Sequence, residues 1–268
     1  MRFQINHDYH IHTRLSTCSR DETQTTEALL TYAKKNGLKK ICVTDHFWDE
    51  TLGCRFRNNE WFEKQDFAHI SKVKPLPVDP EVEFLFGCEA DMDSDDTLGI
   101  SPQRYDEFAF IVVATTHFHM VDGAKWEDRT PAALAKHWVQ RLDRVLSSDL
   151  PLNKTGIAHL ACHLISRGDR ENYLATLDQI PTEELQRLFT KAAQKGVGIE
   201  LNYDDMYRTL QNGEEAPLRL FRTAKTCGCK FYLGSDAHNH MDLARDNDVF
   251  ERVITLLDLQ ESDKFHFE

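Results

Sequence analysis

The sequence lacks the features that mark membrane proteins and secreted proteins. It contains no apolar run that approaches the about 20 residues needed to cross a bilayer. Its first residues, MRFQINHDYHIHT, include neither an apolar signal segment nor a cleavage site, so we expect no secretory leader. The 7 cysteines form no CxxC pair and no disulfide framework. Together these absences favour a protein of the reducing cytoplasm without a membrane partner.

Positive charge is also scarce. The chain has 32 lysines and arginines against 44 acidic residues, which gives a formal net charge of −12. An acidic surface repels phosphate backbones, so we expect no bulk binding of nucleic acid. A small anionic substrate remains compatible with this charge, because bound metal ions can reverse the sign of the field inside one pocket.

Apolar runs and helical patterns alternate along the chain. Short runs rich in β-branched and aromatic residues predict strands at residues 8–13, 39–46, 82–90, 108–118, 155–160, 197–202 and 230–238. Amphipathic stretches predict helices at residues 25–37, 131–148, 181–196 and 242–259. The alternation predicts a parallel sheet, and a single α/β barrel domain over residues 1–268 is the simplest arrangement. Such barrels carry their chemistry at the carboxyl ends of the strands.

The segment 47–80 interrupts this alternation. Its aromatic residues include Trp48, Phe56, Trp61, Phe62 and Phe67, and it ends in KPLPVDP. We expect the aromatic side chains to pack the segment on the barrel as a helical excursion. The alternative is a lid or a substrate wall above the strand ends.

Most of the predicted strands end in residues that bind metal ions. The first carries His10 and His12, which face the same side because strand residues i and i+2 share a face. Five further strand ends carry Thr44-Asp45-His46, Cys88-Glu89-Ala90-Asp91, His117, His159 and Ser235-Asp236-Ala237-His238. One such group occurs by chance, but six strand ends together predict a metal site. We expect His119, His163 and His240 to lie on the surface, behind the ligands or against the substrate.

Two acidic residues near these histidines are candidates to orient them. Asp8 has the strand parity of His10, and Asp45 directly precedes His46. A carboxylate that accepts a ring N–H fixes the tautomer of a ligand histidine. Asp8 can equally be a simple capping or turn residue.

The order of the motifs resembles the PHP superfamily, which is named for polymerase and histidinol phosphatase. The motifs are HxHT, TDH, GCEAD, THF, IAHL and GSDAH, and they extend from about residue 8 to residue 240. The aromatic segment after TDH and the IELN strand are most similar to the stand-alone histidinol-phosphatase-like branch. The resemblance implies a distorted (β/α)7 TIM-like barrel that holds two to three divalent ions of zinc, iron or manganese.

The resemblance also implies which residues hold each ion. By motif, the ligands would be His10, His12, Glu89 and Asp236 for a first ion, His117 and His159 with bridging Glu89 for a second, and His46 and His238 for a third. Related proteins with the spacing HTxxSTH supply a further histidine, and Cys18 occupies that position here. A thiolate is itself a good zinc ligand, so Cys18 is a candidate ligand. Glu200 and Asn202 would lie near the site without being ligands.

The expected activity is hydrolysis of a small phosphate monoester, histidinol phosphate or a similar metabolite, as in histidine biosynthesis. Bound ions make the pocket positive and can lower the pKa of a bound water to ~7, which supplies a hydroxide nucleophile. We expect Asp236, Glu89 and His238 to be the catalytic residues. We expect Arg14 and Arg208 to bind the phosphate, because arginine pairs with phosphate through two parallel hydrogen bonds.

Two other functions stay open. An amidohydrolase that cleaves C–N bonds shares the HxH strand and the late aspartate, but we find no convincing strand-end lysine for a carbamylated bridge. A PHP-like module that binds metal without catalysis is the second, and the nearly complete ligand set argues against it. Asp204 and Asp205 could contact a cationic substrate end or cap the next helix, so the alcohol of the substrate stays open. The sequence also leaves the oligomeric state open.

Overall fold

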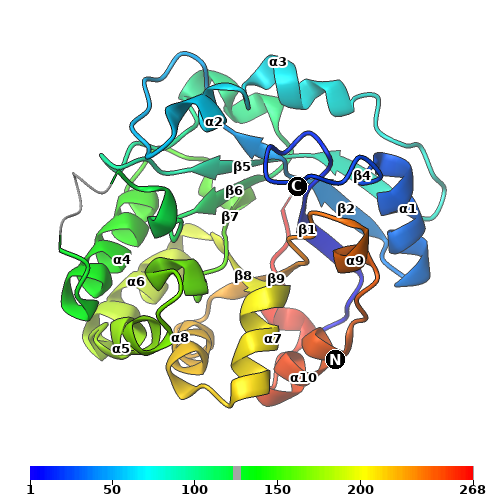
Figure 1. The fold of residues 1–268 in the computed structure, drawn as a ribbon. Helices are drawn as coiled ribbons and strands as arrows, with labels where there is room; N and C mark the ends of the chain where they lie inside the picture. Colours follow the sequence, from blue (N-terminus) through cyan, green and yellow to red (C-terminus); the bar gives the residue numbers. More distant parts are fainter. Residues whose placement is uncertain (123–127, 268) are drawn as a thin grey trace.

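The computed structural model describes residues 1–122 and 128–267. Its strands pair in parallel and lie at the centre of the molecule, as Figure 1 shows. The strands are β1 (His7–Ile11), β2 (Lys40–Val43), β3 (His46–Phe47), β4 (Glu83–Phe86), β5 (Cys88–Asp91), β6 (Ile111–Ala114), β7 (Thr155–Ile157), β8 (Gly198–Asn202) and β9 (Lys230–Gly234). An α/β fold with parallel strands therefore confirms the predicted fold class.

Two pairs of short strands continue one another. β3 follows β2 after Thr44 and Asp45, and β5 follows β4 after Gly87. The ladders run in the order β1-β2-β4 and β3-β5-β6-β7-β8-β9, so each continued strand passes from the first ladder into the second. A Cβ atom at Gly87 would lie 2.6 Å from both Cys42 Sγ and the Phe110 carbonyl oxygen. Glycine is therefore required where β4 passes into β5.

The last strand returns to the first. β9 lies beside β1, and two backbone hydrogen bonds join the segments that follow these strands. The His12 N–H donates to the Ala237 carbonyl at 3.1 Å, and the Asp236 N–H donates to the His10 carbonyl at 2.7 Å. Within the described residues no strand ladder joins β9 to β1. The two edges are instead held by these bonds and by two side chains of β1, since His7 Nε2 accepts the Leu233 N–H at 3.0 Å and Asp8 Oδ1 accepts the Ser235 N–H at 3.1 Å.

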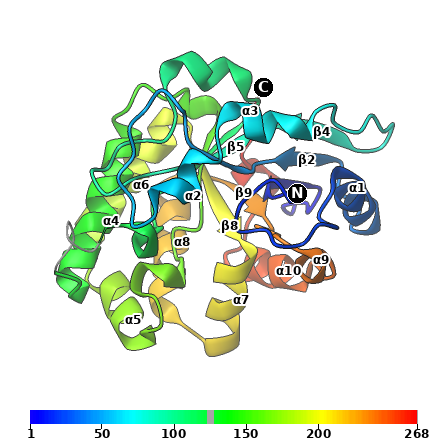
Figure 2. The same cartoon turned by 45° about the horizontal axis from the view of Figure 1, so that its top comes forward.

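The longer helices lie around the outside of the strands in both Figure 1 and Figure 2. The helices are α1 (Thr26–Lys35), α2 (Asn59–Glu63), α3 (Phe67–Ile70), α4 (Pro131–Leu146), α5 (Arg170–Asp178), α6 (Thr182–Lys195), α7 (Tyr203–Asn212), α8 (Glu215–Thr226), α9 (His240–Leu243) and α10 (Asp248–Leu256). Short 3-10 helices lie at Ser71–Val73, Pro102–Glu107, Phe118–Met120, Leu152–Lys154, His163–Ser166 and Glu261–Asp263. None of the described helices is long and apolar enough to span a membrane.

Three of the four predicted helices agree with the structure, and the signals at their ends explain why. The side chains of Thr25 and Thr130 cap α1 and α4 by accepting backbone N–H groups. Gly196 ends α6 with a φ of 71°, a left-handed conformation that glycine adopts at little cost.

The fourth predicted helix, at residues 242–259, was wrong as a continuous element. It is divided into α9 and α10 by a non-helical stretch that contains Asp246 and Asn247. The Asp246 carboxylate accepts the backbone N–H of Asp248 at 3.1 Å. Short polar side chains compete with helical hydrogen bonds in this way, so the chain leaves the helix and starts a new one.

The segment after β3 packs through its aromatic residues. Trp48, Phe56 and Phe62 are buried and form one apolar cluster, in which the rings of Phe56 and Phe62 stack at 3.5 Å. Phe67 on α3 contacts Phe108 of the main core, with ring centroids 5.9 Å apart. Phe62 thus holds α2 in the aromatic cluster, and Phe67 anchors α3 on the main core.

Candidate metal centre

Four predicted ligands meet beyond the carboxyl ends of β1, β5 and β9. Both His10 Nε2 and His12 Nε2 lie 3.4 Å from Glu89 Oε2. Asp236 Oδ1 lies 3.5 Å from His10 Nε2 and 3.1 Å from His12 Nε2. Two ligand atoms that bind one tetrahedral ion at about 2.1 Å are about 3.4 Å apart. The four side chains therefore have the spacing that one zinc-sized ion requires.

Glu89 connects this group to a second one. Its Oε1 lies 3.0 Å from His159 Nε2, and Glu89, His117 and His159 form a group whose ligand atoms are all within 4.8 Å of one another. Glu89 Oε2 is buried and has no hydrogen-bond partner. A buried carboxylate oxygen without a partner is costly, and a cation shared with His10 and His12 would satisfy it.

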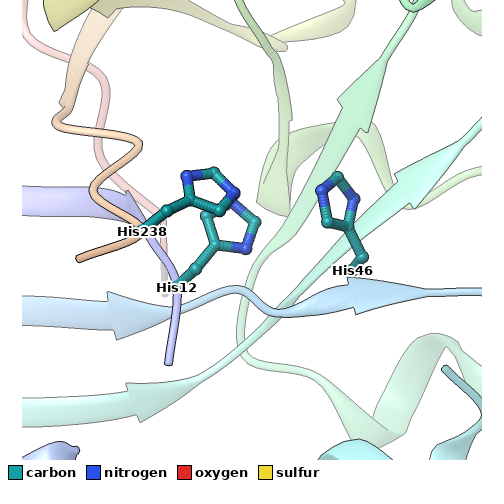
Figure 3. A group of neighbouring side chains, drawn as sticks. All are labelled: His12, His46 and His238. Carbon is teal, nitrogen blue, oxygen red and sulfur yellow. The ribbon is translucent and has the colours of Figure 1, made fainter. Parts of the chain in front are cut away.

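A third group lies nearer to solvent. His12, His46 and His238 form it, and Figure 3 shows the rings of His12 and His238 side by side with His46 facing them. The His12 and His238 rings stack at 4.0 Å. Cys18 is exposed and lines the same cleft as His46 and His238. It therefore stays a candidate ligand of a third ion.

The rings of all six histidines are held in the same way, by an acceptor at Nδ1. The pairs are His10 with Glu200 Oε1 at 2.7 Å, His12 with Ser16 Oγ at 2.8 Å, His46 with Asp91 Oδ2 at 3.0 Å, His117 with Asp91 Oδ1 at 2.6 Å, His159 with Thr116 Oγ1 at 2.8 Å, and His238 with the Asp236 carbonyl at 2.7 Å. Three acceptors are carboxylate oxygens and one is a carbonyl, so they accept from a ring N–H.

The two hydroxyl partners act as acceptors as well. Ser16 Oγ donates its own hydrogen to Asp45 Oδ1 at 2.7 Å, and Thr116 Oγ1 donates to the His159 carbonyl at 3.0 Å. Each oxygen is therefore left to accept the ring N–H. A proton at Nδ1 leaves the Nε2 lone pair unprotonated, which is the state that binds a metal ion.

Neither of the two acidic candidates accepts a ring N–H, and for Asp8 this agrees with the alternative of a capping or turn residue. Asp8 accepts the hydroxyl hydrogen of Tyr32 and backbone N–H groups rather than a ring N–H. Asp45 binds Thr13 and Ser16, so it reaches His12 only through the serine. The acceptors that we missed are Ser16, Asp91 and Thr116. Only Asp91 had a readable signal, because it shares the strand parity of Glu89.

Two ligand positions have an unusual backbone conformation. The φ angles of His159 and Asp236 are 28° and 53°, in the region that residues with a Cβ atom rarely adopt. Such conformations cost about 1–3 kcal/mol and persist where the surrounding structure determines them. At Asp236 the backbone hydrogen bond to the His10 carbonyl fixes the conformation.

The charges of the metal-free site depend on one another. Burial alone would raise the pKa of Glu89, but the positive charges of His46 and His10 hold it well below its usual range. Burial alone would lower the pKa of His238, but the hydrogen bond and charge of Cys18 raise it to about 9. Burial would likewise raise the pKa of Cys18, whereas the charge of His46 and the hydrogen bond with His238 lower it to about 7. Protons therefore occupy the positions that cations would take.

Sequence comparison agrees with this geometry. The model of the PHP domain family matches residues 8–204. The chain belongs to the PHP family. The match ends before β9, so Asp236 and His238 of this PHP protein are connected to the site by the structure rather than by the family model. No curated protein sequence matches the chain.

Two solved structures have the same fold as this PHP protein. One is the histidinol phosphate phosphatase of Lactococcus lactis in complex with zinc, L-histidinol and phosphate, with 18% sequence identity and a TM-score of 0.60. That comparison covers 98% of this chain and 95% of the other. The second is the hisK protein of Listeria monocytogenes, with 11% identity and a TM-score of 0.65, covering 91% of this chain and 100% of the other. At these identities the likeness shows the fold alone.

A cleft of about 640 Å³ opens onto the metal groups of the PHP protein. Its lining residues include Glu89, His46, His117, Asp236, His238, Cys18, His119, Arg20, Arg167, Asn58, Trp61, Met120 and Leu164. The predicted phosphate ligands Arg14 and Arg208 do not line it. Arg14 is exposed and pairs with Glu22 at 3.2 Å, and Arg208 lines a separate cavity of about 220 Å³ beside α7. The arginines at the cleft are instead Arg20 and Arg167.

Proposed function

We propose that the protein is a metal-dependent phosphoesterase that hydrolyses small phosphate monoesters. The observation that carries this proposal is the common state of the six histidines. Each has an acceptor at Nδ1, and the rings group around Glu89 and Asp236. Six rings oriented for metal binding in one cleft are what a cluster of divalent ions requires.

Eight side chains fit the ligand roles without rearrangement, and Cys18 is the ninth candidate. They are His10, His12, His46, Glu89, His117, His159, Asp236 and His238. Bound divalent ions would supply the positive charge that polarises phosphoryl oxygens and lowers the pKa of water. Within the site, Glu89, Asp236 and His238 are the residues we assign to catalysis, because they face the cleft where the ester must lie.

The cleft offers separate places for the two parts of an ester. Arg20 and Arg167 line it and can bind phosphate oxygens through paired N–H donors. Trp61, Met120 and Leu164 form an apolar wall for the organic part. The ring of Trp61 also contacts the ring of His46 edge to face, with centroids 5.1 Å apart, so this wall borders the metal groups directly. A lid or wall function of segment 47–80 would thus rest on Trp61.

The neighbour from Lactococcus lactis suggests the first substrate and metal to test. That protein was solved with zinc, L-histidinol and phosphate. The shared fold, together with the histidine and carboxylate groups of this chain, makes histidinol phosphate and zinc the first candidates here. We further propose that the protein acts in the cytoplasm on a free metabolite.

The test is phosphate release by protein whose metal content has been measured. Wild-type protein loaded with zinc, manganese or iron should release phosphate from histidinol phosphate or from another ester in a panel of sugar phosphates and nucleotides. Removal of the ions with EDTA should abolish the release, and addition of the ions should restore it. Cleavage of amides or lactones with no phosphate release would favour the amidohydrolase, and no turnover at full metal loading would favour an inactive binding module.

A further inference from the structure

One buried carboxylate contacts histidines from two different metal groups. Asp91 is the last residue of β5 and is completely buried. Its Oδ1 lies 2.6 Å from Nδ1 of His117, and its Oδ2 lies 3.0 Å from Nδ1 of His46. His117 groups with Glu89 and His159, whereas His46 groups with His12 and His238. Asp91 thus links a histidine of one group to a histidine of the other through one hydrogen bond from each carboxylate oxygen. Nδ1 of His46 also lies 3.0 Å from Glu89 Oε2, so Asp91 and Glu89 both face this nitrogen.

We propose that Asp91 is a positioning residue that couples the two ion sites, so that loading of one strengthens binding at the other. This inference rests on the metal centre of the proposed function. Because both oxygens of one planar carboxylate are engaged, an ion that fixes the ring of His117 also fixes the carboxylate. The fixed carboxylate then holds the ring of His46 with Nε2 free. Coupling of this kind is reciprocal, so either ion can prepare the site of the other.

The two-oxygen arrangement explains why a carboxylate is needed at this position. Asparagine has the same shape, but it has one acceptor oxygen and one NH₂ group. The oxygen could accept from one histidine, while the NH₂ group would face the other ring and require an unprotonated Nδ1. That ring would then carry its proton on Nε2, where the ion must bind. Asp91→Asn should therefore keep the volume of the side chain and lose the correct tautomer at one of the two sites.

Asp93 provides a matched control two residues further along the chain. It is also a buried aspartate, and its carboxylate accepts the backbone N–H groups of Arg55, Asp95 and Thr97 at 2.8–3.0 Å. Within the described residues, none of the Asp93 hydrogen bonds involves a histidine ring. Asp93→Asn therefore tests the loss of a buried charge without disturbing a candidate ligand.

The experiment is a zinc titration of metal-free protein against a chromophoric chelator, with the folded state of each variant checked by near-UV circular dichroism. Wild type should bind its ions cooperatively. Asp91→Asn should weaken binding by roughly 10–100-fold, the usual cost of losing an outer partner, and should abolish the cooperativity. Asp93→Asn should retain the affinity of wild type. Equal zinc affinities of Asp91→Asn and wild type would overturn the inference, whereas a wild type that binds no ion would overturn the proposed function itself.

A measurement on wild type keeps the test decisive if Asp91→Asn does not fold. Nitrogen-15 spectra of the metal-free protein distinguish imidazoles protonated at Nδ1 from those protonated at Nε2 only. His46 and His117, assigned by single substitution of each histidine, should both carry a proton at Nδ1. Protonation of either ring at Nε2 alone would contradict the role of Asp91.

Discussion

The metal centre has a deep end and a mouth, and the two are built differently. At the deep end His10, His12 and Glu89 are at most 1% exposed, and each lies on a strand or directly after one. At the mouth Cys18 belongs to a loop and the side chain of His238 is 25% exposed. The fold therefore fixes the ligands at the deep end, while the mouth depends on loops. The departure from the family pattern, Cys18, lies at the mouth.

The largest effect should come from the deep end. Glu89→Gln and Asp236→Ala should each lower phosphatase turnover by more than about 100-fold, because losing only an outer partner of a ligand already costs 10–100-fold. Steady-state phosphate release at saturating metal measures this. The control is Asp106→Ala, whose side chain is fully exposed. If Glu89→Gln or Asp236→Ala kept the turnover of wild type, the deep end would not be more important for activity than the mouth.

Substitutions at the mouth should remove one metal ion and leave the others bound. If Cys18 is a ligand, Cys18→Ser should lose about one equivalent of metal, and Cys18→His should retain it because imidazole also binds zinc at this position. Metal analysis of the purified variants gives the stoichiometry. If Cys18→Ser keeps both its metal content and its activity, the thiol is an ordinary loop residue and the third ion has another ligand.

A smaller effect should distinguish Arg167, which lines the cleft, from Arg208, which lines the neighbouring cavity. Arg167→Ala should raise KM by about 10-fold, since a hydrogen bond to a charged group contributes about 1.5–3 kcal/mol and a phosphate contact made before the reaction is uniform binding. Arg208 lines the separate cavity, so Arg208→Ala should change KM less. Initial rates over a range of substrate concentrations measure both. A larger KM for Arg208→Ala would return Arg208 to the phosphate site.

A buried acid behind the deep end should affect stability rather than activity. Burial raises the pKa of Asp205 to about 8, while in the unfolded chain it is close to 4. The folded state therefore binds this proton more tightly, so its stabilising contribution is complete below about pH 4 and is lost as the pH rises to 8. The metal-free Asp205→Asn variant should gain stability relative to wild type over that range, by up to about 1.4 kcal/mol per pH unit. Urea denaturation at several pH values measures the difference, and a gap independent of pH would show that Asp205 is ionised in the fold.

The convergence of the candidate ligands could be predicted from the sequence because strands fix their positions. Residues i and i+2 of one strand share a face, and parallel strands bring their carboxyl ends together, so His10 and Glu89 converge without any knowledge of loops. The acceptors behind the rings were harder to predict. Thr116 holds the ring of His159 on another strand end, and that pairing depends on how neighbouring strands are placed.

The arginines were not predictable for a different reason. Arg14 and Arg20 both follow β1, and only the path of the loop decides which of them reaches the cleft. Arg14 turns outward to Glu22, while Arg20 lines the cleft. The break before α10 was also not predictable. There the Asp246 carboxylate competes with a helical carbonyl for one backbone N–H, and the two hydrogen bonds differ little in free energy.

The backbone hydrogen bonds between β1 and β9 have a consequence for biosynthesis. They join His10 to Asp236 and His12 to Ala237. The contacts of the HxH segment, which is synthesised early, therefore form only after the segment around Asp236 has been synthesised. Until Asp236 has left the ribosome, the growing chain has the HxH pair but neither the candidate ligand Asp236 nor the contacts between β1 and β9. An abortive product that stops before β9 would thus be left with a free histidine pair and an open sheet edge, and we expect it to bind metal more weakly than the longer chain.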